Sequence, residues 1–209
     1  MNVFDKIVLL VTGLAAIYLI WIFSNRNQQK KLLFDIYYLS GFGVLLVSAL
    51  LMIFLGYEIL ASPYVLTAAS LILLGISTGL VNLSFPHARR AYSWFALIGS
   101  LAIAFTSIAV LSLKKFAVPV FHGAAGLIIF GSPIKLSLNG KKPKGFWWVE
   151  NGGMLIGMGG IALAFMTLGS LLLFFSQEFV LLILAPLLLF MTLAFNYGFL
   201  QDIKSTQMF

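Results

Sequence analysis

Long uninterrupted apolar stretches constrain the fold of this chain more than any other feature of its sequence. Each is close to the roughly 20 residues that a helix needs to cross a hydrocarbon layer of about 30 Å. The stretches are continuously apolar and do not alternate with polar residues, which favours helices over strands. We therefore predict an all-α, polytopic integral membrane bundle of about seven transmembrane helices. Their expected spans are about 7–24, 32–55, 64–85, 91–113, 116–134, 146–176 and 179–200.

The composition and the short connections leave room for little besides these helices. Only 9% of the 209 residues are charged, against roughly 25% in soluble domains. The longest connection, residues 135–145, is too short to fold by itself. We expect one transmembrane domain over 1–209, with no soluble domain, in the cytoplasmic (inner) membrane of a prokaryote. Cysteine is absent, which excludes thiolate-bound iron–sulfur clusters held by this chain.

Basic residues divide unevenly between the two faces when the connections are assigned to them alternately. Ten of the thirteen fall on one face: Arg26, Lys30, Lys31, Arg89, Arg90, Lys135, Lys141, Lys142, Lys144 and Lys204. Cytoplasmic loops carry an excess of Lys and Arg, so we predict an outside N-terminus and an inside C-terminus. The charge of +7 is then explained by topology and by anionic lipid headgroups. It is spread over short loops, so we expect membrane lipids and no nucleic acid as partners.

The fifth stretch, 116–134, is the least regular because it contains Pro119 and Pro133. A re-entrant loop is the alternative to a full crossing. Such a loop would carry the lysines of residues 135–145 to the outer face, against the bias of basic residues toward the inside. We therefore predict a full crossing.

The sixth stretch contains the sequence GMGGIA at 157–162, which has the G-x-G-x-x-A spacing of a dinucleotide-binding loop. That loop needs a preceding buried strand and a helix open to water, whereas this segment is apolar on both sides, so we expect no nucleotide. Gly153, Gly157, Gly160 and Ala164 instead fall on one face of a helix. Small residues let membrane helices approach closely, which predicts a helix-packing surface. Whether it meets this chain or a partner stays open.

His122 is the most distinctive polar residue within a predicted span. Ionisable residues inside a membrane are costly and often functional, and imidazole is a common haem ligand. We take His122 as a candidate contact for a haem, quinone or pigment shared with a partner subunit; a structural polar residue is the alternative. The other histidine, His87, lies at the inner end of the third stretch, so we expect no haem held by both within this chain.

A second group of charged residues is expected near the inner face, as a polar pocket for a quinone or a lipid headgroup. Its members are Asp35, Arg89, Arg90, Lys135 and Glu150. A plain interfacial carboxylate paired with basic loops is the alternative for Glu150. No catalytic triad, metal-ligand spacing or Walker loop is present in the sequence. We therefore predict no catalytic residue and no metal site, and no enzyme acting alone, although the chain could belong to an oxidoreductase complex.

Two classes of function are consistent with these features. The first is a non-catalytic integral subunit of a larger membrane complex, such as a respiratory or other electron-transfer assembly, in contact with other integral subunits. It would supply helix packing and lipid, quinone or haem-pocket contacts. The alternative is a small oligomeric transporter or channel-like protein. A transporter needs polar groups near the middle of the bilayer, where this sequence offers almost none, so we favour the subunit.

The topology is testable because the chain has no cysteine of its own. Single cysteines at Gln28 and Ser137 are expected to react with a membrane-impermeant thiol reagent only from the cytoplasmic side. A cysteine at Ser62 should react only from outside. Labelling of the Ser137 position from outside would make the fifth stretch re-entrant and overturn the assignment.

Overall fold

The computed structural model describes residues 1–167 and 176–207, and all regular secondary structure in this part of the chain is helical. The α-helices are α1 (Val3–Lys30), α2 (Leu33–Leu55), α3 (Pro63–Ser84), α4 (Arg89–Ile108), α5 (Leu111–Leu138), α6 (Trp148–Thr167) and α7 (Gln177–Gln207). Two short 3-10 helices, η1 (Tyr57–Ala61) and η2 (Lys144–Trp147), lie in the connections. Over these ranges no strand is present, which confirms the predicted all-α bundle.

Six of the helices in the described ranges are long and apolar enough to span a membrane, namely α1, α2, α3, α4, α5 and α7. Helix α6 is not among them, and residues 168–175 of the predicted span 146–176 lie outside the described residues. A membrane crossing by α6 therefore stays a prediction. Helix α5 runs as one 28-residue helix through Pro119 and Pro133, about 42 Å at 1.5 Å per residue, without the reversal that a re-entrant loop requires.

The ends of α1 are set by local hydrogen bonds. The Asn2 side chain accepts from the Asp5 backbone nitrogen at 2.8 Å, and the Asp5 carboxylate accepts from the Asn2 backbone nitrogen at 3.3 Å. This reciprocal capping box satisfies amide donors that a helix start leaves free. At the other end Lys31 adopts a left-handed conformation with φ of 48°, which ends the helix. The chain then turns directly into α2.

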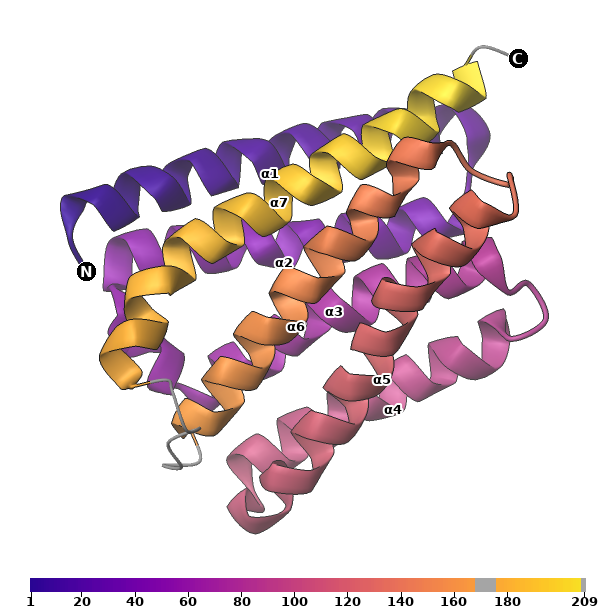
Figure 1. Cartoon of the computed structure of the whole chain (residues 1–209). Coiled ribbons are helices and arrows are strands. Elements are labelled where there is room, and N and C mark those ends of the chain that lie inside the picture. Colours follow the sequence, from indigo (N-terminus) through magenta and orange to yellow (C-terminus); the bar gives the residue numbers. More distant parts are fainter. Residues whose placement is uncertain (168–175, 208–209) are drawn as a thin grey trace.

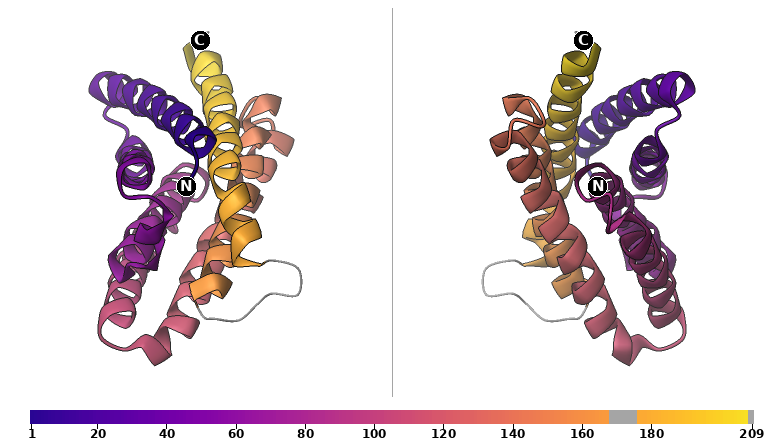
Figure 2. Two further views of the ribbon diagram at one scale, coloured as in Figure 1. Left: turned by 90° about the vertical axis from the view of Figure 1, so that its left-hand side faces the viewer. Right: turned by 90° about the vertical axis from the view of Figure 1, so that its right-hand side faces the viewer.

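The helices form two layers (Figures 1 and 2). One layer contains α1, α2, α3 and α4, each in contact with the next, and the other contains α5, α6 and α7. The layers meet where α1 contacts α7 and where α5 contacts α3 and α4. The N-terminus and the C-terminus lie at opposite ends of the bundle in Figure 1. We call the end with the α1–α2, α3–α4 and α5–α6 connections the basic end.

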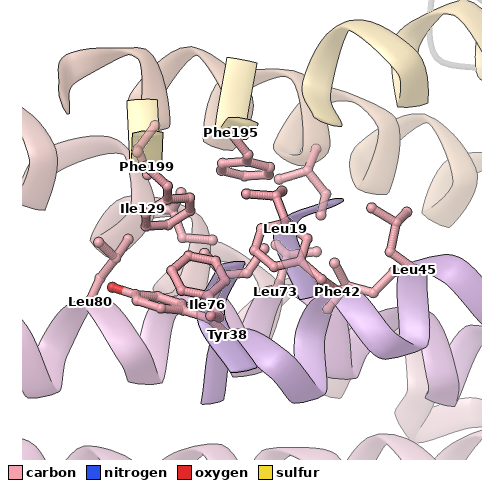
Figure 3. Close-up of a cluster of buried hydrophobic side chains, with 14 of the residues drawn as sticks. Leu19, Tyr38, Phe42, Leu45, Leu73, Ile76, Leu80, Ile129, Phe195 and Phe199 are labelled. Atoms are coloured by element: carbon pink, nitrogen blue, oxygen red, sulfur yellow. The ribbon is translucent and has the colours of Figure 1, made fainter. Parts of the chain in front are cut away.

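An aromatic cluster fills the space between the two layers (Figure 3). Phe42 of α2 packs edge-on against Phe195 and Phe199 of α7, with ring centroids 5.7 and 6.1 Å apart. Tyr38 lies 4.7 Å from Phe199. All four side chains are buried. Such offset and edge-to-face pairs add about 0.5–1.5 kcal/mol each beyond the area they bury, so this cluster is a main contact between the layers.

Glycine allows two of the helix pairs to approach closely. Between α2 and α3, a Cβ built at Gly41 would lie 3.1 Å from the Ile72 carbonyl oxygen. Between α6 and α7, a Cβ built at Gly198 would lie 2.7 Å from the Val149 backbone nitrogen. Because the obstructing atoms belong to backbone, a side chain at either position would push two helices apart.

Replacing Gly198 by alanine is therefore expected to destabilise the bundle. Alanine favours a helix by about 1 kcal/mol over glycine, but overpacking costs about 1–3 kcal/mol. We expect Gly198→Ala to lower the thermal unfolding midpoint in detergent. Gly43→Ala is the matched control, since no atom lies within 4 Å of its Cβ position, and its midpoint should stay unchanged or rise. Equal midpoints for the two variants would show that α6 and α7 do not pack as described.

Candidate functional site

A buried ion cluster at the basic end joins α1, α2 and α7. The Arg26 Nε donates to both Asp35 carboxylate oxygens at 3.0 Å, and a guanidinium Nη2 also donates to Asp35. The Arg26 Nη1 reaches Asp202 of α7 at 3.4 Å. Arg26 is 8% exposed and Asp35 is fully buried. The guanidinium therefore bridges two carboxylates from two other helices.

Further cationic contacts surround this cluster. The Arg26 guanidinium carbon lies 5.0 Å from the Phe23 ring centroid and 5.3 Å from that of Phe34. The Lys142 ammonium, from the α5–α6 connection, donates to Asp202 at 2.5 Å. Cation–π contacts and charge-assisted hydrogen bonds are stronger where water is excluded. The cluster thus also ties the α5–α6 connection to α7.

The predicted polar pocket of the inner face is divided by the structure. Its five residues all belong to the basic end: Asp35, Arg89, Arg90, Lys135 and Glu150. Arg89 and Arg90 line a common cavity, and the other three residues are not among the described residues that line it. Asp35 is enclosed by its pairing with Arg26, and the Lys135 ammonium lies 4.7 Å from the Phe85 ring centroid. Glu150 makes no ion pair within the described ranges. The sequence correctly placed these residues at one end of the bundle. It did not show that their side chains face different neighbours there and so do not share one pocket.

The predicted packing glycines of α6 have unlike surroundings. A Cβ at Gly153 would collide with the Ile129 side chain of α5, and one at Gly160 would touch His122 Cδ2 at 3.5 Å. At Gly157 no atom lies within 4 Å. The side chain of Ala164 is outside the described residues. Within this chain, α5 and α6 approach closely at Gly153 and leave open space at Gly157.

That open space is part of an apolar cavity between α5 and α6, with a volume of about 620 Å³. Glycines from both helices form part of its wall, together with Phe130, Met154 and Met158. Among the described lining residues, His122 has the only ionisable side chain. The histidine lies 16 residues before the end of α5, about 24 Å along the helix axis. His87 is in the exposed α3–α4 connection, so the two histidines lie at different levels of the bundle.

The hydrogen bonding of His122 determines which of its nitrogens is available. Its Nδ1 lies 3.1 Å from the Val118 carbonyl oxygen. A carbonyl only accepts, so Nδ1 carries the proton and donates. Nε2 of the neutral ring is then an acceptor or a metal ligand, and no described residue provides it with a hydrogen bond. Among the described residues, His122 has no further metal ligands beside it. The described ranges hold no group of three His, Cys, Asp or Glu side chains suited to a metal ion.

Sequence reasoning singled out Asp35 and His122 but missed Arg26, Lys142 and Asp202 as members of a site. The available signal was the scarcity of acidic residues, since only six occur in the chain. Two of the three at the basic end are almost completely buried, and a buried carboxylate needs a cation. Which of ten nearby cations would fill that role depended on the packing of α1 against α2 and α7.

The ion cluster predicts unequal costs for removing two carboxylates from the same end. Asp35→Asn leaves the buried Arg26 without its main counter-ion, and breaking a buried pair in this way costs about 3–5 kcal/mol. We expect a large fall in the unfolding midpoint in detergent, reduced in part by the remaining Asp202 contact. Glu150→Gln, the matched control, should change stability by no more than about 0.5 kcal/mol. Similar losses in both variants would contradict the cluster.

Comparison with known proteins adds no assignment to this geometry. No protein-family model, curated protein or solved structure matches the chain. Because a fold does not by itself imply a function, the proposal below rests on the cavity between α5 and α6, here called the groove, and on its polar groups.

Proposed function

We propose that this chain is a non-catalytic integral subunit of a larger membrane complex, and that a transmembrane helix of another subunit closes the groove between α5 and α6. One observation carries the proposal: the groove is lined almost entirely by α5 and α6, with Leu73 of α3 as the one further described residue, and three of its five glycines face open space. No atom lies within 4 Å of the Cβ position of Gly123, Gly126 or Gly157. Such surfaces let a further helix backbone approach closely.

His122 favours a protein partner over lipid as the occupant. A polar group in the hydrocarbon region is costly unless it is hydrogen-bonded, and Nε2 of His122 has no partner in the described part of the chain. An acyl chain has no group to offer it. A side chain of a neighbouring subunit, or a cofactor held between the two, does.

The same histidine supports an electron-transfer assembly as the class of complex. A ring whose Nδ1 donates to a backbone carbonyl has its orientation and tautomer set, and its Nε2 is ready to ligate a metal or to accept from a hydroxyl. These are the contacts made to haem iron and to the reduced form of a quinone. The described lining of the groove provides one such ligand, so the remaining contacts would come from the partner.

The proposal is tested by a matched pair of substitutions on α5. Gly126 lines the groove and Gly131 does not, and neither has an atom within 4 Å of its Cβ position. Both leucine variants should therefore fold as well as the parent chain. We expect that mild detergent extraction from the native membrane yields a complex containing further integral membrane chains, identified by mass spectrometry. Gly126→Leu should reduce the recovery of those chains at least tenfold, and Gly131→Leu should leave it unchanged.

Several outcomes would count against this function. Elution of the parent chain as a monomer without companions would contradict the subunit proposal. A complex made only of copies of this chain would favour the oligomeric transporter instead. Equal loss of the complex in Gly126→Leu and Gly131→Leu would remove the groove as the contact surface. An absorption spectrum of the intact complex, compared with that of His122→Ala, tests the electron-transfer class independently.

A further inference from the structure

A second cavity, of about 580 Å³, lies at the basic end between the starts of α2 and α4 and the end of α3. Its lining has a polar part and an apolar part. Arg89, Arg90, Asn82 and the hydroxyls of two further residues form a polar part. Apolar side chains form the rest: Leu33, Trp94 and Leu97. Trp94 and Leu97 are 57% and 48% exposed, so the apolar part is continuous with the outer surface of α4.

The groups in this cavity that remain available to a ligand are mainly hydrogen-bond donors and positive charges. The Ser93 hydroxyl donates to the Arg89 carbonyl at 2.9 Å. Its proton is thereby committed, so Tyr37 is the donor in the 3.2 Å contact between the Tyr37 and Ser93 hydroxyls. Asn82 donates one amide hydrogen to the Thr78 carbonyl at 2.9 Å. Neither Arg89 nor Arg90 makes a salt bridge with any described residue.

The charge around the cavity favours binding of an external anion. Ten cationic side chains and only three carboxylates belong to the basic end. Asp35 and Asp202 are already paired with Arg26 and Lys142. Arg89 and Arg90 are exposed, and an anion between or beside two adjacent arginines reduces their mutual repulsion. A phosphodiester fits them, because guanidinium groups bind phosphate oxygens with paired hydrogen bonds.

We propose that this cavity is a binding site for an anionic phospholipid. Arg89 and Arg90 bind the phosphate, Asn82 donates to a headgroup oxygen, and an acyl chain lies along Trp94 and Leu97. The apolar wall distinguishes this ligand from a free phosphate ion, which gains nothing from it. This site goes beyond the proposed subunit function and adds a selective contact with one lipid headgroup class. It requires a membrane but no partner subunit, so it can be tested independently of the subunit proposal.

Trp94 lines the cavity and can report on its occupant. The chain has three other tryptophans, Trp21, Trp147 and Trp148, each of which is exposed. Replacing these three by phenylalanine leaves Trp94 as the single fluorophore. The purified full chain is reconstituted in phosphatidylcholine vesicles that contain a small fraction of brominated phosphatidylglycerol or, in parallel, brominated phosphatidylcholine. Bromine quenches tryptophan only at short range, so quenching measures which lipid occupies the site.

We expect phosphatidylglycerol to be favoured over phosphatidylcholine at Trp94 by on the order of tenfold, since each basic side chain near the surface attracts anionic lipid. R89Q/R90Q should lose this preference. K141Q/K204Q is the matched control: it removes two exposed cations from the same end that do not line the cavity, and it should keep the preference. R89K/R90K retains the charge and should restore most of it. Circular dichroism verifies that each variant is folded.

Three results would overturn the site. Equal quenching by the two brominated lipids in the parent chain would show no headgroup selectivity. An equal loss in R89Q/R90Q and K141Q/K204Q would show a general surface-charge effect. Complete reversal of the phosphatidylglycerol preference by inorganic phosphate would assign the arginines to a free ion. None of these results depends on whether the chain has partner subunits, whereas extraction without companions would affect only the subunit proposal.

Discussion

The buried pairing of Arg26 with Asp35 and Asp202 connects parts of the chain that are distant in sequence. Two carboxylates and a guanidinium out of water are tolerated only when each is paired and hydrogen-bonded, and here α1, α2 and α7 each contribute one member. The turn between α1 and α2 brings the first two together. The contact with Asp202 then sets how far α7 can slide along α1, and so aligns one layer with the other.

The aromatic cluster depends on that alignment. Phe195 and Phe199 reach Phe42 and Tyr38 only if α7 is in this register relative to α2. Away from the cluster, specific polar contacts between helices are few; one is the Asn196 amide of α7, which donates to the Ala15 carbonyl of α1 at 3.1 Å. Dispersion contacts are additive but not specific, whereas an ion pair is lost by a shift of one residue. The charges specify the arrangement and the aromatic rings supply much of the contact.

The two candidate ligand sites differ because their surroundings differ. The His122 groove lies in the apolar part of the bundle, between two helices whose glycines leave a wall incomplete. A single polar atom there has large consequences, because water cannot satisfy it. The arginine cavity lies at the basic end, where charge is tolerated and lipid headgroups supply anions. We therefore propose a partner with one complementary group for the first site and an amphiphile with one charge for the second.

Sequence alone determined the helical class, the approximate positions of the helices and the end at which the basic residues gather. These follow from local properties, since twenty apolar residues in a row can satisfy their backbone in a bilayer only as a helix. It also identified His122 and the α6 glycines as distinctive. It did not determine that Gly157 is open while Gly153 is crowded, because the spacing along one helix says nothing about its neighbours.

Tertiary structure alone decided which charges are paired and which remain available. Asp35 was expected to share a pocket with Arg89, yet it belongs with Arg26. All three residues lie at one level along the helix axes, which sequence spacing can establish. Their separation across the bundle depends on the order of the helices around the core, and that order is set by contacts between segments far apart in the chain. The periodicity of residues within one helix does not indicate which other helices it contacts.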